Sequence, residues 1–291
     1  MKFLCAFFSL AFLATTCFAA TENPLREVED FQFAGRALQE DGGSYTISFD
    51  AAPKGIPLEA LCGTIVPESA AVYEHMQRVP LDESRDLPAK LDWREQTVLP
   101  AIRNQGSCGS CWAFSAVGIL ESAIAIKTGN VLNLSEQDLL NCNTYGYGCD
   151  GGWMDILGHF KTYGSPLESA EPYVGKENSC KSGLDRSYKI ISWGTASSAT
   201  SSIKQAIATY GPVSSVVAAD SSFQYYSGGV FNHDSSVSVN HAIILVGWDD
   251  SLGNGCWILR NSWGTGWGNS GYMYIEYGKC KVGSYNYVVT Y

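Results

Sequence analysis

Basic residues are scarce in this sequence. Its 291 residues include 19 lysines and arginines against 29 aspartates and glutamates, which gives a formal charge of −10 with histidine neutral. Nucleic acids and anionic membranes both favour clustered Lys and Arg on a protein partner. We therefore expect neither nucleic acid nor a membrane as a partner.

Long apolar runs are also missing beyond the N-terminus. Lys2 precedes the apolar stretch Phe3–Leu13, and the small residues Ala19 and Ala20 follow. Charge, apolar core and cleavage site in this order predict a signal peptide over residues 1–20. No later stretch approaches the roughly 18 unbroken apolar residues of a membrane span. The sequence thus predicts a soluble product of the secretory pathway.

Histidine is rare, with four residues in the whole chain. With so few imidazoles to charge, an acidic protein loses much of its negative charge only as its carboxylates begin to protonate near pH 5. This composition favours either an extracellular space or an acidic lysosome- or vacuole-like compartment as the place of action.

Cysteine, in contrast, is plentiful. Of ten cysteines, Cys5 and Cys17 leave with the signal peptide, and Cys62 lies in a segment expected to be removed. The remainder predict a disulfide framework in an oxidising compartment. Seven cysteines remain: Cys108, Cys111, Cys142, Cys149, Cys180, Cys256 and Cys280. An odd number leaves one thiol unpaired, and such a thiol in an exported protein is a candidate reactive group.

After the signal peptide the chain divides into three sections. Residues 21–86 are polar and rich in small residues, and we interpret them as a pro-segment that ends in the charged run 81–86, a candidate processing site. Residues 87–192 are predicted to be mainly helical and residues 193–291 rich in strands, which indicates an α+β protein of two domains. Prolines are expected to prevent any long helix in the pro-segment, at Pro53, Pro57, Pro67 and Pro80.

Apolar periodicity predicts the main elements. A buried helix is expected from Cys111 to Lys127, ended by Gly129. A second helix begins at Ser135 with a capping-box pattern, and a third is expected over residues 201–210. Strands are predicted at Val213–Val217, Ala242–Gly247, Trp257–Arg260 and Tyr272–Tyr277.

Cys111 stands in the first turn of its predicted helix, after a run of small and polar residues. The positive end of the helix dipole favours the thiolate, and small neighbours keep the sulfur reachable. Acyl transfer by a thiolate also needs a base, a group that orients the base, and donors to the oxyanion. His241 at the head of a strand, Asn261 after the next strand, and Gln105 together with the Cys111 backbone N–H are the candidates for these roles.

Other features have simpler interpretations. Cys108-x-x-Cys111 matches the pattern of a redox dithiol, but no strand precedes it as in a thioredoxin-like protein. The same pair could be half of a zinc site, but the sequence offers no second pair of ligands. Residues 266–271 match a dinucleotide fingerprint, yet they run into a strand, so a turn is expected. His75 lies in the pro-segment, and His159 and His233 are interpreted as structural. We expect no metal and no other cofactor.

Six motifs resemble, in the same order, those of papain and the cathepsins. His241 follows Cys111 by 130 positions and Asn261 follows His241 by 20, as in that family. The chain is identified as a papain-like cysteine peptidase over roughly residues 87–291. The motifs are QGSCGSCWAFS (105–115), LSEQ (134–137), GCDGG (148–152), GPVS (211–214), NHA (240–242) and NSWGTGWG (261–268).

The resemblance implies a papain-like fold in which a helical domain supplies Cys111 and a β-barrel-like domain supplies His241 across a cleft. Trp263 would shield the hydrogen bond between His241 and Asn261 from water. Gly151 and Gly152 would pair with the substrate backbone. The pocket for the second residue before the cut would favour apolar side chains, with its floor near Tyr285 and its walls formed by Trp153, Met154, Val216 and Ala242.

The resemblance also implies the disulfides Cys108–Cys149 and Cys142–Cys180. Ser235 and Ser236 stand where papain-like enzymes often carry a further cysteine, so a Cys256–Cys280 bond is expected by exclusion. Residues 21–86 lack the interspersed Glu, Arg, Phe and Asn pattern of cathepsin L propeptides. Occlusion of the cleft by this segment is therefore a hypothesis that rests on its position and length.

A monomeric endopeptidase made as a zymogen is the predicted activity, with protein and peptide substrates and with cystatin-type inhibitors as candidate protein partners. A non-catalytic homologue that binds peptides or inhibitors is the alternative from another class, although such proteins usually lose the thiol or the imidazole. An exopeptidase is the nearer alternative, but the sequence has no His-His insertion of the cathepsin B type and no mini-chain. Asn133 begins a glycosylation sequon beside a helix cap.

Overall fold

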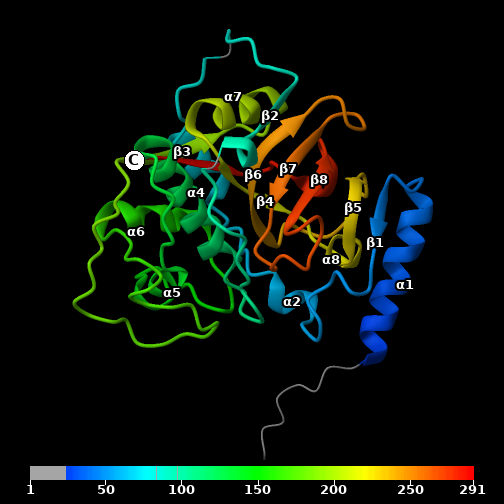
Figure 1. Cartoon of the computed structure of the whole chain (residues 1–291), viewed down its shortest axis with the longest axis horizontal. Helices are drawn as coiled ribbons and strands as arrows, with labels where there is room; N and C mark the ends of the chain where they lie inside the picture. Colours follow the sequence, from blue (N-terminus) through cyan, green and yellow to red (C-terminus); the bar gives the residue numbers. More distant parts are fainter. Residues whose placement is uncertain (1–23, 83, 97) are drawn as a thin grey trace, which may run out of the picture.

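The computed structural model describes residues 24–82, 84–96 and 98–291, and the predicted signal peptide lies outside them. A large sheet lies beside a group of helices, with α4 between the two (Figure 1). The sheet has the strand order β1-β5-β8-β7-β6-β4-β9-β3, and β2 pairs with β6 beside this path. The combination of helices and one mixed sheet confirms the predicted α+β class.

The elements in the described part of the chain have the following bounds. The α-helices are α1 Pro24–Glu40, α2 Leu58–Leu61, α3 Ala70–Met76, α4 Cys111–Thr128, α5 Glu136–Cys142, α6 Leu157–Thr162, α7 Thr200–Tyr210 and α8 Ser221–Gln224. The strands are β1 Tyr45–Ile47, β2 Lys90–Asp92, β3 Ser192–Ala196, β4 Val213–Val217, β5 Tyr226–Phe231, β6 His241–Asp249, β7 Cys256–Arg260, β8 Tyr272–Glu276 and β9 Asn286–Thr290. Short 3-10 helices cover Trp93–Gln96, Met154–Ile156 and Lys279–Lys281.

Helix α4 is the helix predicted from Cys111. By length and composition it could cross a membrane, but 83% of it is buried inside the protein, which is typical of a core helix. Gly129 ends it in the left-handed conformation with φ of 77°, and the Gly129 N–H donates to the Ala125 carbonyl. The predicted start and end of this helix are both confirmed.

Strand β6 separates two hydrophobic cores. Ala242, Ile244 and Val246 face a cluster that includes α4, whereas Ile243 and Leu245 face a second cluster that includes α7. Side chains alternate along a strand, so one strand buried on both faces serves both cores. This burial explains why β6 reads in the sequence as a continuous apolar run.

Helix α4 is fixed to the sheet by close packing and by buried hydrogen bonds. Ser115 Oγ donates to the Ile243 carbonyl at 2.8 Å and lies 2.7 Å from Ser214 Oγ on β4. At Gly118 a Cβ atom would lie 2.5 Å from Ile244 Cδ1, so any larger residue would have to displace the end of the Ile244 side chain. Because α4 begins at Cys111 and β6 begins at His241, these contacts also fix the relative positions of the two residues.

The four predicted strands are present as β4, β6, β7 and β8. Strands β3, β5 and β9 were not predicted. Strand β5 contains two adjacent glycines, a residue type with low strand propensity. Its conformation is held by pairing with β8, as in Val230↔Tyr274. Strand β2 comes from the section predicted to be helical and pairs with β6, as in Leu91↔Trp248.

Helix α1 overturns the expectation that residues 21–86 contain no long helix, since it is 17 residues long. Pro24 opens it, where a proline is compatible with a helix, and the next proline is Pro53. The Phe31 ring packs on Tyr225 with centroids 5.1 Å apart. Downstream, β1 pairs antiparallel with β5 and extends the sheet at that edge (Figure 1).

The disulfides Cys108–Cys149 and Cys142–Cys180 are present. The expected Cys256–Cys280 bond is wrong, because both of these thiols are free and buried. Cys256 Sγ lies 3.6 Å from the Asp249 carbonyl at the end of β6, whereas Cys280 Sγ lies 3.4 Å from the His233 carbonyl in the loop after β5. Burial rather than pairing protects these two sulfurs, which a count of cysteines cannot detect.

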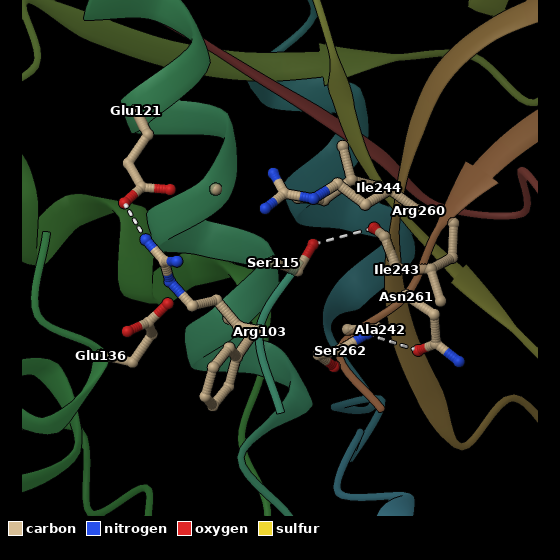
Figure 2. A pocket seen from close by; sticks show the side chains of 12 residues that line it. Arg103, Ser115, Glu121, Glu136, Ala242, Ile243, Ile244, Arg260, Asn261 and Ser262 are labelled. Carbon is tan, nitrogen blue, oxygen red and sulfur yellow. Dashed lines mark hydrogen bonds and ion pairs between the residues drawn. The ribbon is translucent and has the colours of Figure 1, made fainter. Parts of the chain in front are cut away.

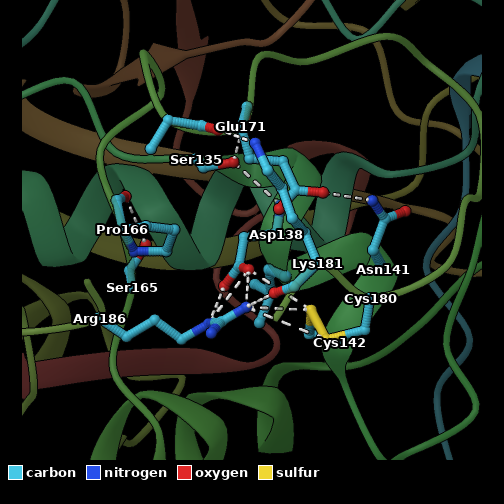
Figure 3. Close-up of polar contacts among 12 residues, drawn as sticks. Ser135, Asp138, Asn141, Cys142, Ser165, Pro166, Glu171, Cys180, Lys181 and Arg186 are labelled. Atoms are coloured by element: carbon cyan, nitrogen blue, oxygen red, sulfur yellow. Dashed lines mark hydrogen bonds and ion pairs between the residues drawn. A yellow bond between two sulfur atoms is a disulfide. The ribbon is translucent and has the colours of Figure 1, made fainter. Parts of the chain in front are cut away.

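An ion pair stands beside the second disulfide (Figure 3). Arg186 donates from Nη2 to Asp138 Oδ1 at 2.6 Å and from Nε to Asp138 Oδ2 at 3.0 Å. Asp138 lies in the first turn of α5, where its N–H donates to Ser135 Oγ at 2.9 Å. The predicted cap at Ser135 is thereby confirmed.

Candidate active site

Cys111 is the first residue of α4, and it is fully buried. Its Sγ accepts a hydrogen bond from the Ala242 N–H at 3.5 Å. Burial opposes ionisation, but the nearby His241 imidazole, with Thr64 and the Ala242 N–H, lowers the pKa of the Cys111 thiol to about 7. A thiol with this pKa is substantially ionised near neutrality, as a nucleophile requires.

His241 begins β6 and faces Cys111 across the seam between α4 and the sheet. Its Nε2 lies 2.7 Å from Asn261 Oδ1, at the end of β7. Nδ1 has no further hydrogen-bond partner among the described residues, so it is the nitrogen left for the thiol. The structure therefore brings together the predicted nucleophile, base and orienting amide from three separate elements.

Aromatic rings enclose the imidazole. The Trp263 ring lies over His241 with centroids 4.7 Å apart, and Phe223 contacts the imidazole edge-on at 6.2 Å. Asn261 is 4% exposed as a result. A hydrogen bond removed from water in this way is electrostatically stronger, so the position of Trp263 agrees with its predicted shielding role.

Gln105 lies beside the thiol, fully buried. Its Nε2 donates to the Leu61 carbonyl at 3.0 Å and to the Cys108 carbonyl at 2.9 Å. Ser262 Oγ donates to Gln105 Oε1 at 2.7 Å, and the Gln105 N–H donates to the Ser262 carbonyl at 2.9 Å. Ser262 thus holds the amide so that one of its N–H groups reaches the Leu61 carbonyl in the cleft while the other is bound by the Cys108 carbonyl.

Sequence reasoning missed Ser262. Its only local signal was its place between Asn261 and Trp263, two residues that had been assigned roles. The contact that gives Ser262 a role is with Gln105, 157 positions earlier in the chain.

The predicted pocket residues cluster on one side of the cleft. Trp153 and Met154 are 1% exposed, and Val216 and Ala242 share the hydrophobic cluster of Cys111. Tyr285 contacts the Trp153 ring edge-on with centroids 5.1 Å apart. Gly151 and Gly152 lie at the cleft wall next to Trp112 and to residues of the pro-segment, as described below.

Residues 61–65, which belong to the predicted pro-segment, occupy this cleft. The Gly63 N–H donates to Cys111 Sγ at 3.3 Å, and Thr64 Oγ1 lies 3.4 Å from the same sulfur. The Gly152 N–H donates to the Gly63 carbonyl at 2.8 Å, and the Ile65 N–H donates to the Gly152 carbonyl at 3.1 Å. Backbone pairing of this kind is how an extended peptide binds a cleft edge.

The occupying segment is held in a geometry unsuited to cleavage. The Gln105 amide binds the Leu61 carbonyl, whereas the sulfur contacts the N–H of Gly63, two residues further along. Attack requires one and the same carbonyl to meet both the nucleophile and the oxyanion donors. Here the two groups contact different peptide units, so the segment covers the site without being presented as a substrate.

A buried group of charges lies behind the site, between α4 and the sheet (Figure 2). Glu121 and Glu136 face Arg103 and Arg260, and the Leu134 N–H donates to Glu121 Oε1 at 2.8 Å. Burial raises the pKa of Glu121 to about 7 and that of Glu136 well above its usual range. Arg260 directly precedes Asn261. The contacts of this buried charged group therefore help to fix the end of β7, where Asn261 lies.

The remaining sequence candidates have other surroundings. Cys108 is in a disulfide, which excludes the redox dithiol. Residues 266–271 form a turn that leads into β8. His159 is buried in α6, and His233 lies between Asp41 and Asp220. Residues 24–82, 84–96 and 98–291 hold no group of three His, Cys, Asp or Glu side chains placed for a metal.

Three comparisons relate the chain to known proteins. A family model described as papain family cysteine protease matches residues 87–290. Over 233 residues the chain is 37% identical to cathepsin K of Mus musculus, which covers 76% of this chain and 69% of the relative.

Solved structures are similar as well. The digestive procathepsin L2 proteinase from Tenebrio molitor larval midgut superposes with a TM-score of 0.80 at 29% identity, over 92% of this chain and 90% of that one. The bromelain protease from Ananas comosus in complex with the E64 inhibitor has a TM-score of 0.66 at 34% identity, over 70% of this chain and 99% of that one.

Proposed function

Because the chain belongs to the papain family of cysteine proteases, we propose that it is the precursor of an endopeptidase with Cys111 as nucleophile and His241 as acid–base group. The observation that carries the proposal is the buried placement of His241 beside Cys111, with His241 Nε2 2.7 Å from Asn261 Oδ1 and the pKa of the thiol lowered to about 7. A structural cysteine in an apolar core has a raised pKa instead.

In the proposed reaction the Cys111 thiolate attacks the scissile carbonyl, and the Gln105 amide and the Cys111 N–H bind the oxyanion. His241 donates its proton to the leaving amine, which departs and leaves an acyl-enzyme. His241 then takes a proton from water, whose oxygen attacks the acyl carbon and releases the acid and the thiolate. Asn261 keeps Nε2 protonated throughout, so that Nδ1 exchanges the proton.

Endopeptidase activity is favoured by the path of the pro-segment. Its chain passes through the cleft and contacts Gln105 on one side of the sulfur and Gly152 on the other. A polypeptide that continues in both directions therefore fits the cleft. An exopeptidase needs one end of the cleft closed, and the described residues place no such barrier there.

The zymogen assignment has two supports. Residues 61–65 cover the nucleophile, and the family model begins only at residue 87. The procathepsin neighbour covers 92% of this chain, whereas the bromelain structure covers 70%. We propose that cleavage near the charged run 81–86 precedes loss of residues 21–86. Export through the secretory pathway to an extracellular or acidic lysosome-like compartment belongs to the same proposal.

The proposed substrates are proteins and peptides with an apolar side chain at the second position before the cut. Support comes from Trp153, Met154, Val216 and Ala242, which supply an apolar wall beside Cys111. The mature enzyme is proposed to act as a monomer and to accept cystatin-type protein inhibitors. By analogy with the bromelain complex, E64 is expected to bind at Cys111.

Active-site labelling tests this proposal. The trimmed wild-type enzyme at pH 5.5 with a reductant is expected to lose activity as iodoacetamide or E64 labels Cys111, and Cys111→Ser should neither label nor hydrolyse. Cys256→Ser, which removes a buried thiol outside the cleft, is the control and should behave as the wild type. Hydrolysis by Cys111→Ser at the wild-type rate would overturn the assignment.

A peptide library distinguishes the modes of cleavage. Peptides blocked at both ends should be cut internally between pH 4 and 7, with apolar residues enriched at the second position before the cut. Cleavage restricted to peptides with a free terminus would instead indicate an exopeptidase. Slow labelling with no hydrolysis would indicate a non-catalytic binder.

A further inference from the structure

Cys62 is a free thiol of the pro-segment that lies in the middle of the occupied cleft. Its neighbour Leu61 binds Gln105 through its carbonyl, and its other neighbour Gly63 donates its N–H to Cys111 Sγ at 3.3 Å. Both flanking residues are thus fixed on the active site. The proposed hydrolysis uses Cys111 but gives Cys62 no role.

The backbone brings the two sulfurs within reach of each other. Cys62 is joined to Gly63 by one peptide bond, so its Cα lies within about 6 Å of Cys111 Sγ. Cys62 has an extended backbone, with φ of −113° and ψ of 99°. In an extended segment alternate side chains share a face, and the Thr64 side chain on that face contacts the same sulfur at 3.4 Å.

The two thiols differ in access and in acidity. Cys111 is fully buried, whereas Cys62 is partly exposed and lines a surface pocket with Glu59, Asp220 and Asn240. His241 lowers the pKa of Cys111, while burial and the neighbouring Cys111 raise the pKa of Cys62. A low-pKa sulfur beside a second thiol is the arrangement of a peroxide-sensitive pair, in which the first is oxidised and the second resolves it.

We propose that Cys62 and Cys111 form a disulfide when the proenzyme meets hydrogen peroxide, and that this bond holds the pro-segment in the cleft until a reductant opens it. The Cys111 thiolate attacks one peroxide oxygen, the O–O bond breaks, and hydroxide leaves, which gives Cys111 sulfenic acid. The Cys62 thiol attacks that sulfur, its proton joins the departing hydroxyl as water, and the S–S bond forms. The two sulfurs lose two electrons, and the peroxide is reduced.

Two consequences follow from this bond. Cleavage near residues 81–86 cannot by itself release a covalently held segment, so activity would appear only after both cleavage and reduction. The bond also stops oxidation of Cys111 at a reversible stage, because without a resolving thiol a sulfenic acid proceeds to irreversible sulfinic and sulfonic acids. The inference rests on the proposed function insofar as Cys111 is the reactive thiol.

The experiment treats the full-length proenzyme with hydrogen peroxide and maps it without reduction. The wild type should lose about 2 Da and yield a peptide pair joined through Cys62 and Cys111. Cys62→Ser should gain about 32 Da or more at Cys111 instead. After dithiothreitol and trimming, the oxidised wild type should regain most of its hydrolysis, whereas Cys62→Ser should regain less than a tenth.

Controls separate this inference from the activity itself. Unoxidised Cys62→Ser, once trimmed, should hydrolyse as fast as the wild type, because residue 62 has been removed; inactivity of both trimmed proteins would refute the proposed function. Cys256→Ser should oxidise like the wild type. Sulfinic acid at Cys111 with a free Cys62 in the wild-type protein, or equal recovery in the wild type and Cys62→Ser, would overturn the disulfide.

Discussion

At the scale of single residues, Gln105, the proposed oxyanion donor, is held by Ser262, which follows Asn261 in the chain. Ser262 Oγ donates to Gln105 Oε1 at 2.7 Å, which fixes the amide so that Nε2 donates to the Leu61 carbonyl in the cleft. The preceding residue, Asn261, accepts from the Ser262 N–H at 2.8 Å through the same oxygen that faces His241. One short loop therefore orients both the base and the oxyanion donor.

Gln105→Ala in the trimmed enzyme is expected to lower kcat by about 10²–10³, because one of two oxyanion donors is lost. KM should change little, since the donor acts on charge that develops in the transition state. Steady-state kinetics with a blocked peptide measures both constants.

Ser262→Ala is expected to have a smaller effect in the same direction, on the order of tenfold in kcat, since the amide remains but is less well held. Gln96→Ala, which removes an exposed glutamine of the 3-10 helix Trp93–Gln96, is the control and should leave kcat within about twofold. A Gln105→Ala enzyme with an unchanged kcat would refute the oxyanion role.

At the scale of elements, the pro-segment fits its cleft through a glycine. A Cβ atom at Gly63 would lie 1.7 Å from the Gly109 carbonyl oxygen, and the obstructing atoms belong to the backbone. The loop before α4 and the pro-segment can approach this closely only without a side chain at position 63. Steric fit, as well as hydrogen bonding, thus holds residues 61–65 over the thiol.

Gly63→Ala should therefore displace the pro-segment from the thiol. A clash of this type costs about 1–3 kcal/mol, which corresponds to roughly tenfold to hundredfold faster alkylation of Cys111 in the uncleaved proenzyme. Iodoacetamide labelling followed by mass spectrometry measures the rate. Gly35→Ala is the matched control, because a Cβ atom there would meet only Ile47 Cδ1 at 4.0 Å, and it should label like the wild type. Equal labelling of all three proteins would show that Gly63 does not set the fit.

A second contact of the pro-segment is sensitive to pH. His233 Nδ1 lies 2.7 Å from Asp41 Oδ2, and Nε2 lies 3.0 Å from Asp220 Oδ2. Burial lowers the pKa of His233, but Asp220 and Asp41 together raise it above its ordinary value. Tyr45 also donates to Asp41 at 3.1 Å, and Cys280 contacts the His233 carbonyl. Asp41 belongs to the pro-segment and His233 to the enzyme, so the ion pair joins the two.

Because the pKa of His233 is raised where the pro-segment is docked, the docked form holds the imidazole proton more tightly than the released form does. The stabilisation is fully present below the ordinary pKa of histidine, about 6.5, and is lost as pH rises through the raised pKa. Limited proteolysis of the pro-segment in full-length Cys111→Ser protein should therefore accelerate between pH 6 and 8, by roughly threefold to tenfold.

His233→Gln and Asp41→Asn should each flatten this pH dependence. Tyr45→Phe is the control, because it removes a hydrogen bond to Asp41 without removing a titrating imidazole, and it should keep the pH dependence. A pH profile for His233→Gln identical to that of the wild type would exclude the imidazole as its source.

At the scale of the whole molecule, two hydrophobic cores share strand β6, and covalent links lie on the helical side. The Cys142–Cys180 bond closes a segment of 38 positions, and Arg186 bridges from Asp138 to the Lys181 carbonyl beside it (Figure 3). Loss of the Cys142–Cys180 bond should lower the free energy of unfolding mainly by raising the entropy of the unfolded chain. The Arg186 contacts of the folded protein can persist without the bond.

The double variant Cys142→Ala, Cys180→Ala is expected to lose about 4 kcal/mol of unfolding free energy, from the entropy of the loop that it frees. In a protein of this size that is a fall in Tm of roughly 10 °C, measurable by calorimetry on the full-length protein. Cys256→Ala removes a buried sulfur without freeing a loop and should cause a much smaller fall. Equal shifts in the two proteins would mean that packing, not cross-linking, accounts for the loss.

Much of the site could be predicted from the sequence because its chemistry is local to short motifs. Cys111 at a helix start, His241 at a strand start and Asn261 after a strand each carried a recognisable context, and the structure brings them together. Helix α4 and strand β6 were predictable because a fully buried element is apolar along its whole length. Strand β5, with its two glycines, was not, because its pairing with β8 decides its conformation.

The sequence alone determined which side chains could do the chemistry and which elements present them, since residue type and apolar periodicity are properties of short stretches. Only the tertiary structure decided that Ser262 bonds Gln105, that Cys256 and Cys280 stay apart, and that Gly63 and Thr64 lie against Cys111. Each of these depends on a distance between residues far apart in the chain. Such distances are set by packing of the complete fold, and no local pattern encodes them.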